Sequence, residues 1–289
     1  MTDKITPKSR INLKNIDTAV DKIKTEIRKV LVGQEEMVDL ILTALLASGH
    51  ILLEGVPGIA KTLTAKLISK TLDIDFSRIQ FTPDLMPSDI TGTNIFNLKK
   101  SVFEFNKGPI FANTILIDEI NRSPAKTQAA LFEVMEEKQI TADGKTYIME
   151  APFIVIATQN PIEYEGTYRL PEAQLDRFLF KIDITYPTPE QELEILKQAN
   201  EQRNTDRIET LKPVLKAQHI VSLQKLVQKV HIEDNLLQYI SEIVNSTRSN
   251  SSLFLGASPR ASLALLESSK AYATLQGRDF VIPEDIKVL

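Results

Sequence analysis

The sequence predicts an α/β fold with a parallel five-stranded sheet flanked by helices, followed by a small all-α domain. Three observations predict it. Short apolar segments alternate with helical patterns in the first part of the chain, only helical patterns follow, and a proline-containing segment at 185–190 separates the two parts. We therefore expect one domain over residues 1–187 and a helical domain over residues 188–289.

Five apolar segments are expected to form the buried strands, because each is short, rich in branched side chains and followed by polar or glycine-containing sequence. Helical patterns follow the first and the third of them. The second of these helices should begin with Ser123 as its N-cap and Pro124 as its first helical residue. The strands are expected at 50–55, 77–82, 114–119, 153–160 and 178–186, and the helices at 60–72 and 123–140.

Two stretches interrupt this alternation and predict β-hairpins inserted into the α/β domain. Residues 91–111 contain two short, partly alternating runs, and residues 138–153 contain Asp143-Gly144, a strong two-residue turn signal. In the helical domain, apolar residues recur at three- and four-residue spacing in four segments. These segments are 189–200, 222–230, 233–248 and 258–277, the last of which lies between Ser258-Pro259 and Gly277.

The composition excludes several kinds of site. The chain has no cysteine and three scattered histidines, which excludes disulfides and cysteine metal sites and makes a histidine metal site improbable. Its net charge of −4 gives no general attraction to nucleic acid. The polar N-terminus lacks the apolar core of a signal peptide, and no apolar run is long enough to cross a bilayer. We therefore expect a soluble, cytoplasmic protein without nucleic acid binding or membrane insertion.

The segment "EGVPGIAKT" (54–62) predicts a binding site for the phosphates of a nucleotide. It lies between a predicted strand and a predicted helix, where backbone N–H groups converge on an anion. Gly55 and Gly58 permit the tight loop, Lys61 is expected to reach the β- and γ-phosphates, and Thr62 is expected to bind Mg²⁺. Ala60 stands where the usual motif has glycine. The alternative is a strand-to-helix turn without a ligand.

Polar residues at two further strand ends fit the same site. Asp118 and Glu119 end the third predicted strand, at the edge where open α/β sheets bind ligands. Because adjacent strand residues point to opposite sides, the two carboxylates can differ in role. Asp118 is expected near the magnesium, and Glu119 as the base that deprotonates water. Thr158 and Asn160 end the next strand and could face the γ-phosphate. The alternatives are two solvated acids and an ordinary Asn-Pro turn.

With these motifs, the sequence resembles the MoxR family of AAA+ ATPases, in the helix-2-insert group. The resemblance covers nearly the whole chain, and Ala60 is common in that family. The segments that carry it are "GVPGIAKT" (55–62), "FTPDLMPSDITG" (81–92), "ILIDEINR" (115–122), "ATQNPIEYEGTYRLPEAQLDRF" (157–178) and "GASPRAS" (256–262).

The resemblance implies roles that spacing alone does not give. Arg177 corresponds to an arginine finger that acts on a neighbouring subunit's ATP, and Arg260 to the sensor arginine of the helical lid. Without the resemblance, Arg177 reads as a helix-surface residue paired with Asp176 or Glu172, and Arg260 as an exposed residue. The implied catalytic residues are Lys61, Glu119, Asn160, Arg177 and Arg260, with Thr62 and Asp118 at Mg²⁺. The implied ATP-binding residues are Val32, Gly33, Gln34, Gly55, Val56, Pro57, Gly58, Ile59, Ala60, Lys61, Thr62 and Leu63.

The resemblance also implies a function and partners. It implies an ATP- and Mg²⁺-dependent ring, most often a hexamer, that remodels a partner protein, and a partner with a von Willebrand factor A domain. The two hairpins would project toward the pore, or else be surface decorations. The chain ends soon after Arg260, which implies a shortened or truncated lid. Two alternatives remain open, namely a DNA-associated or magnesium-chelatase-like motor and a non-hydrolysing ATP switch.

Overall fold

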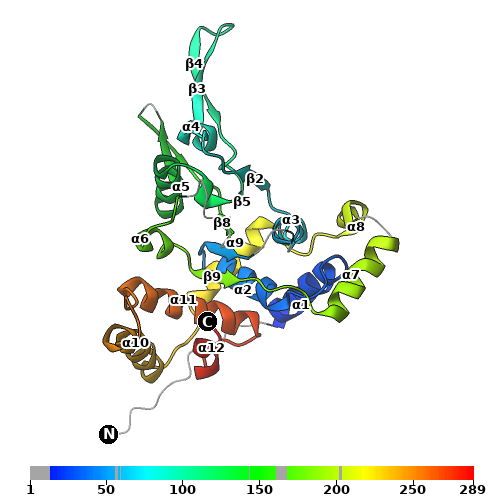
Figure 1. Cartoon of the computed structure of the whole chain (residues 1–289), viewed down its shortest axis with the longest axis vertical. Helices are drawn as coiled ribbons and strands as arrows, with labels where there is room; N and C mark the ends of the chain where they lie inside the picture. Colours follow the sequence, from blue (N-terminus) through cyan, green and yellow to red (C-terminus); the bar gives the residue numbers. More distant parts are fainter. Residues whose placement is uncertain (1–13, 56–57, 59, 143, 161–167, 202–203) are drawn as a thin grey trace.

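A computed structural model describes residues 14–55, 58, 60–142, 144–160, 168–201 and 204–289. A parallel sheet lies in the middle of the fold, helices pack against it, and a long hairpin extends away from it (Figure 1). The helices are α1 Lys14–Arg28, α2 Glu35–Leu46, α3 Lys61–Thr71, α4 Pro87–Thr91, α5 Ala125–Glu137, α6 Glu172–Leu175, α7 Pro189–Glu201, α8 Asn204–Thr210, α9 Ala217–Val227, α10 Asp234–Ser249, α11 Pro259–Leu275 and α12 Pro283–Lys287.

The central sheet contains all five predicted strands, and every pairing in it is parallel, which confirms the predicted fold class. The strand order is β2-β5-β8-β1-β9. The carboxyl ends of β5, β8 and β1 therefore lie next to one another at one edge. The strands are β1 Ile51–Glu54, β2 Phe76–Gln80, β5 Thr114–Asp118, β8 Ile154–Gln159 and β9 Phe180–Asp183.

Side chains of the central strands divide between two hydrophobic cores, one on each face of the sheet. In β5, Leu116 belongs to the core that includes α1, α2 and α3, whereas Ile115 and Ile117 belong to the core that includes α4 and α5. This alternation follows from the two-residue period of a strand. Strands with both faces covered need apolar residues at consecutive positions, which explains the continuous apolar runs in the sequence.

The start of α5 differs from the prediction. Pro124, not Ser123, takes the N-cap position, and the helix begins at Ala125. The carbonyl of Pro124 accepts hydrogen bonds from the amides of Thr127 and Gln128, so Pro124 already provides the first helical acceptor. The Ser123 side chain is fully buried and its hydroxyl has no partner among the described residues. Ser123 therefore does not cap the helix.

Both predicted hairpins are present. Strands β3 (Gly92–Asn97) and β4 (Val102–Lys107) form one antiparallel pair, and β6 (Gln139–Ala142) and β7 (Lys145–Ile148) form the other. Asp143 of the second turn lies outside the described residues. The β3–β4 hairpin extends far from the sheet (cyan in Figure 1). Close backbone contacts fix its base, because a Cβ on Gly108 would lie 2.2 Å from the carbonyl oxygen of Ile90.

The helices after residue 188 include the four that the sequence predicts, now seen as α7, α9, α10 and α11, together with α8 and α12. Helices α10, α11 and α12 share a small core of their own. Ile220 and Val227 of α9 instead belong to the larger core beneath the sheet. The domain boundary at 187/188 stays a prediction. Among the described residues, no helix has both the length and the hydropathy that a bilayer crossing requires.

Candidate functional site

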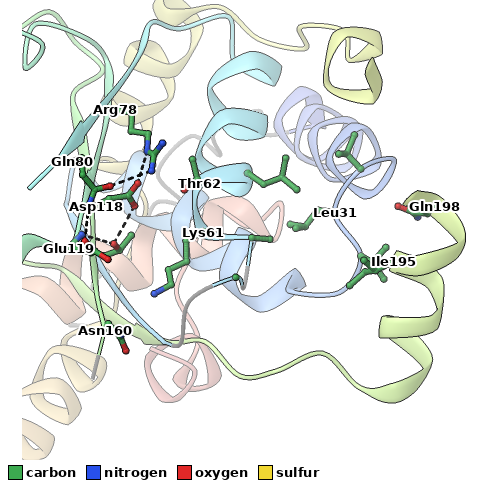
Figure 2. A pocket seen from close by; sticks show the side chains of 16 residues that line it. Leu31, Lys61, Thr62, Arg78, Gln80, Asp118, Glu119, Asn160, Ile195 and Gln198 are labelled. Carbon is green, nitrogen blue, oxygen red and sulfur yellow. Dashed lines mark hydrogen bonds and ion pairs between the residues drawn. The ribbon is translucent and has the colours of Figure 1, made fainter. Parts of the chain in front are cut away.

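A cleft of about 540 Å³ opens at the carboxyl ends of β1, β5 and β8. The residues that line it come from six parts of the chain: the segment before α2, the loop before α3 with the start of that helix, the ends of β2, β5 and β8, and helix α7. Figure 2 shows Lys61, Asp118, Glu119 and Asn160 around the same space. Because the sheet order places β8 between β5 and β1, residues that are distant in sequence meet here.

The loop between β1 and α3 supplies one wall of the cleft. Gly58 has φ +89°, and no atom lies within 4 Å of the place where its Cβ would be, so the backbone conformation alone favours glycine there. Ala60 takes the left-handed N-cap position of α3 with φ 44°. The cleft lining includes Gly58, Ala60, Lys61, Thr62 and Leu63. Val56, Pro57 and Ile59 of the predicted binding loop lie outside the described residues.

Lys61 carries the positive charge of this wall. Its Nζ donates a hydrogen bond to the carbonyl oxygen of Gly55 at 2.5 Å, and the ammonium group therefore lies across the loop. Burial lowers the pKa of Lys61 from its usual value, while the nearby carboxylates of Asp118, Glu119 and Glu54 oppose that shift. A half-buried cation surrounded by carboxylates is suited to bind an anion that carries its own divalent cation.

Asp118, the last residue of β5, is nearly buried, with 9% of its surface exposed. Both of its oxygens have partners. Oδ2 accepts a hydrogen bond from Nε of Arg78 at 2.6 Å, and Oδ1 accepts one from Oγ1 of Thr158 at 3.3 Å. These contacts fix the orientation of the carboxylate toward the cleft.

Glu119 differs from the simple strand pattern. It follows the end of β5 with φ 58° and ψ 54°, a left-handed conformation that is uncommon for residues with a side chain. Because of this turn, its side chain faces the same cleft as that of Asp118 rather than the opposite side of the sheet. Its Oε2 accepts a hydrogen bond from Nε2 of Gln80 at 2.7 Å and lies 3.2 Å from Nε of Arg122. Holding a residue other than glycine in this backbone conformation costs about 1–3 kcal/mol of folding free energy, and such residues cluster at functional sites.

The end of β8 brings Thr158 and Asn160 beside these carboxylates. Both side chains are almost completely buried, and both line the cleft. Asn160 lies opposite Lys61, as the sequence suggests (Figure 2). Thr158 instead directs its hydroxyl at Asp118, so it is not placed to meet a phosphate.

Sequence reasoning missed Arg78 and Gln80, which point into the cleft from β2. They are two positions apart on β2, so their side chains share one face of the strand. Gln80 is paired with Asp118 in the register of β2 and β5, and Arg78 donates its hydrogen bond to the Asp118 carboxylate. The signal was present in "SRIQFT", where two polar residues two positions apart share one face of a strand. Which residues these two side chains meet, however, depends on which strand lies beside β2 in the sheet.

The other end of the cleft is more apolar. Val30, Leu31 and Val32 line it together with Ile195 and Gln198 of α7. Of Val32, Gly33 and Gln34, which the resemblance implies as ATP-binding residues, Val32 lines the cleft. Gly33 and Gln34 follow it with φ 70° and 60°. The side-chain amide of Gln34 donates to the carbonyl oxygen of Thr185, which ties this segment to the exit of β9.

Arg177 and Arg260 do not line the cleft. Nη1 of Arg177 donates to the carbonyl oxygen of Phe132 at 3.1 Å and to Oε2 of Glu136 at 2.9 Å. Nη2 of Arg260 donates to Oε1 of the same Glu136 at 2.9 Å. Arg177 thus pairs with α5 rather than with Asp176, whose carboxylate accepts hydrogen bonds from the Ser258 hydroxyl. The structure therefore brings both arginines to one carboxylate, outside the cleft.

Comparison with known proteins agrees with this geometry. Residues 50–180 match the family described as "ATPase family associated with various cellular activities (AAA)", and residues 245–289 match an AAA lid domain. The first match spans the central strands and the cleft residues Lys61, Asp118, Glu119 and Asn160. The second spans the helix that carries Arg260.

Relatives cover most of the chain. The sequence is 51% identical over 268 residues to the uncharacterized protein YeaC of Bacillus subtilis, covering 93% of this chain and 83% of that protein. It is 44% identical over 270 residues to Chaperone MoxR1 of Mycobacterium tuberculosis, covering 90% of this chain and 70% of that protein. A crystal structure of a proposed ATPase from Cytophaga hutchinsonii superposes with a TM-score of 0.88 at 44% identity, covering 96% of this chain and 86% of the other.

Proposed function

Because this chain belongs to the MoxR family of AAA+ ATPases, we propose that it hydrolyses ATP with Mg²⁺ in the cleft at the end of the sheet. One observation carries the proposal: Lys61, Asp118, Glu119 and Asn160 line a single cleft although they come from the start of α3 and from the ends of β5 and β8. A cation, two carboxylates and an amide around one space are the groups that phosphoryl transfer to water requires.

ATP would lie along the cleft with its base at the apolar end. Val32, Leu31 and Ile195 offer apolar contacts there, and Gln198 offers an amide. The triphosphate would follow the loop from Gly55 to Leu63 to the positive end of α3, where the backbone amides and Lys61 bind it.

The donor groups at the phosphate end fit a magnesium ion. Thr62 offers a hydroxyl and Asp118 a carboxylate, both lining the cleft, and oxygen donors of this kind suit Mg²⁺. When bound, the ion would neutralise charge on the phosphates. Asp118 is already oriented by Arg78 and Thr158, so little rearrangement of its carboxylate is needed.

Glu119 would accept the proton of the attacking water, and Asn160 would orient that water against the γ-phosphate. Gln80 and Arg122 hold the carboxylate of Glu119 in the cleft.

Arg177 and Arg260 support a ring in which each ATP lies between two subunits. Both arginines bind Glu136 outside the cleft, so both belong to one surface of the subunit. From that surface they would act on the nucleotide of a neighbouring copy, as guanidinium groups do when a second subunit supplies them. A closed ring with such head-to-tail contacts suits a hexamer.

We further propose that hydrolysis drives the remodelling of a partner protein, a chaperone-like role. The β3–β4 hairpin supports this, because Phe103 and Leu98 are largely exposed at its distal part. A partner with a von Willebrand factor A domain would deliver or regulate the client. The α/β domain over 1–187 would hold ATP, and the helices over 188–289 would transmit its state.

The decisive experiment replaces Glu119 with Gln in the full chain. Glu119→Gln should bind ATP with an affinity within about threefold of wild type, because shape and hydrogen bonding persist, and lower kcat by about 100-fold or more. Phosphate release and binding of a fluorescent ATP analogue measure the two quantities. Undiminished hydrolysis in this variant would remove Glu119 as the base, and a wild-type protein without Mg²⁺-dependent hydrolysis would overturn the function.

A further inference from the structure

Thr158 lies between the two residues whose carboxylates define the cleft. It is in β8, with 4% of its surface exposed. The backbone amide of Glu119 donates to its Oγ1 at 3.0 Å, and Oγ1 lies 3.3 Å from Oδ1 of Asp118. One buried hydroxyl therefore contacts both members of the acidic pair.

The chemistry of a hydroxyl fixes the direction of both bonds. The amide of Glu119 can only donate, so Oγ1 accepts from it. The single proton of the hydroxyl then goes to Oδ1 of Asp118, which as a carboxylate can only accept. The same side chain thus holds the backbone of one residue and the side chain of the other.

The contact occurs where the sheet pairing ends. The hydrogen-bonded register between β5 and β8 stops at the pair Ile117–Ala157. Two residues after Ile117, the chain takes the left-handed conformation at Glu119. The hydroxyl of Thr158 supplies the acceptor for the amide of Glu119 beyond the last strand pair, and it stabilises a conformation that a residue with a side chain seldom adopts.

We propose that Thr158 is a positioning residue of the hydrolytic site. It stabilises the left-handed turn that directs the Glu119 carboxylate into the cleft, and it orients the Asp118 carboxylate for the magnesium ion. This inference rests on the proposed ATPase function. Thr158 acts through Asp118 and Glu119, so its loss affects catalysis and the magnesium requirement more than ATP affinity.

The simpler explanation is that Thr158 only satisfies its own buried hydroxyl. The two explanations differ in what a valine does. Thr158→Val keeps the shape of the side chain but leaves the amide of Glu119 and Oδ1 of Asp118 without this partner. Thr158→Ser keeps the hydroxyl and loses only a methyl group.

A matched control exists in the same sheet. Thr114, the first residue of β5, is fully buried, and its hydroxyl has no hydrogen-bond partner within the described part of the chain. Thr114→Val makes the same chemical change at the amino-terminal end of β5, away from the cleft, without removing a hydrogen bond between described residues. It measures what the substitution does to folding alone.

The test compares the wild type with Thr158→Val, Thr158→Ser and Thr114→Val as full chains. Thr158→Val should lower kcat about tenfold or more, with KM for ATP changed by less than about threefold, because the residues proposed to contact the base and the phosphates directly are not altered. It should also raise the half-saturating Mg²⁺ concentration several-fold. Thr158→Ser should retain most of kcat, and Thr114→Val should match the wild type. Equal kcat values in the two valine variants, or no rescue by serine, would refute the role.

A second measurement does not depend on hydrolysis. Amide hydrogen exchange at Glu119 should be slow in wild type and in Thr158→Ser, and about tenfold or more faster in Thr158→Val because the amide loses its acceptor. Unchanged exchange overturns the inference while leaving the ATPase proposal intact. A wild type that shows protected exchange at Glu119 but no ATP hydrolysis overturns the ATPase proposal, and with it the catalytic consequence of the contact.

Discussion

Arg177 and Arg260 bind opposite oxygens of one carboxylate, that of Glu136 on α5, each at 2.9 Å. The three side chains are between 29% and 49% exposed, so solvent weakens both ion pairs. Exposed pairs of this kind contribute about 0–1 kcal/mol each. Either ion pair can therefore be broken at a small cost in free energy, and both depend on the same Glu136 carboxylate.

Removing this carboxylate should take the ion-pair partner from both arginines at once, while Arg177 keeps its hydrogen bond to the carbonyl oxygen of Phe132. Glu136→Ala is expected to raise ATP turnover by about two- to fivefold, because two competing exposed pairs are lost. The thermal unfolding midpoint should stay within about two degrees of wild type for the same reason. Glu133→Ala on the same helix, an exposed position with no ion pair recorded in the described chain, is the matched control. Slower turnover in Glu136→Ala would show that Glu136 supports the arginines rather than competing for them.

Mixing two inactive variants tests whether sites are shared. Arg177→Ala and Glu119→Gln should each be nearly inactive alone while still binding ATP. In an equal mixture, about a quarter of the sites would combine an intact Glu119 with an intact Arg177 from the next subunit, so about a quarter of wild-type activity should return. Steady-state phosphate release after subunit exchange measures this. Should the mixture stay as inactive as its components, Arg177 does not act across a subunit boundary.

His50 makes stability depend on pH. It is buried, its Nδ1 accepts a hydrogen bond from the amide of Val155 at 3.0 Å, and its other nitrogen lies 3.2 Å from the carbonyl oxygen of Met135. Burial lowers the pKa of His50 to about 4, helped by the positive charge of Lys138 and opposed by the contact with Met135. The unfolded chain therefore binds this proton near pH 6.5, before the folded chain does.

The free energy of unfolding should consequently fall by roughly 3 kcal/mol because of His50 alone as pH decreases from about 6.5 to about 4. Above about pH 6.5, His50 should make no pH-dependent contribution to stability. Urea unfolding at a series of pH values measures the slope. His50→Gln, which cannot take up the proton, should show a flatter profile over this range whatever its absolute stability. Parallel profiles for the two proteins would contradict the assignment.

The exposed apolar residues of the β3–β4 hairpin should bind unfolded protein. Phe103 is 70% and Leu98 84% exposed, and Phe96 packs edge-on against Phe103 at 5.1 Å. Phe103→Ser combined with Leu98→Ser should weaken binding of a labelled, permanently unfolded polypeptide by about tenfold, since two large apolar contacts are lost. ATP turnover without a client should not change. Leu237→Ser, an exposed apolar position on α10, is the control, and equal weakening by it would mean non-specific adhesion.

The strands and hairpins were predictable because their signals are local. Consecutive apolar residues mark strands covered on both faces, and Asp143-Gly144 marks a tight turn. The roles of Arg78 and Gln80 were not predictable from one sequence, because they depend on β2 lying beside β5. A period-two pattern shows that two side chains share a face, but it does not show which strand that face meets.

Two features of the site depend on local exceptions rather than on patterns. Strand alternation places Glu119 opposite Asp118, but the left-handed turn at Glu119 returns its side chain to the same side. At α5, the general preference for serine as N-cap is overridden because Pro124 supplies the first acceptor and Ser123 is buried. The shared contact of Arg177 and Arg260 with Glu136 joins three segments that are distant in sequence, which no local signal contains.

The base of the β3–β4 hairpin and its tip are under very different constraints. Gly92 and Gly108 lie so close to neighbouring backbone atoms that any side chain at either position would collide with them. The distal residues, by contrast, project into solvent and touch little else. Substitutions in the distal part of the β3–β4 hairpin should therefore leave the direction in which the hairpin projects unchanged.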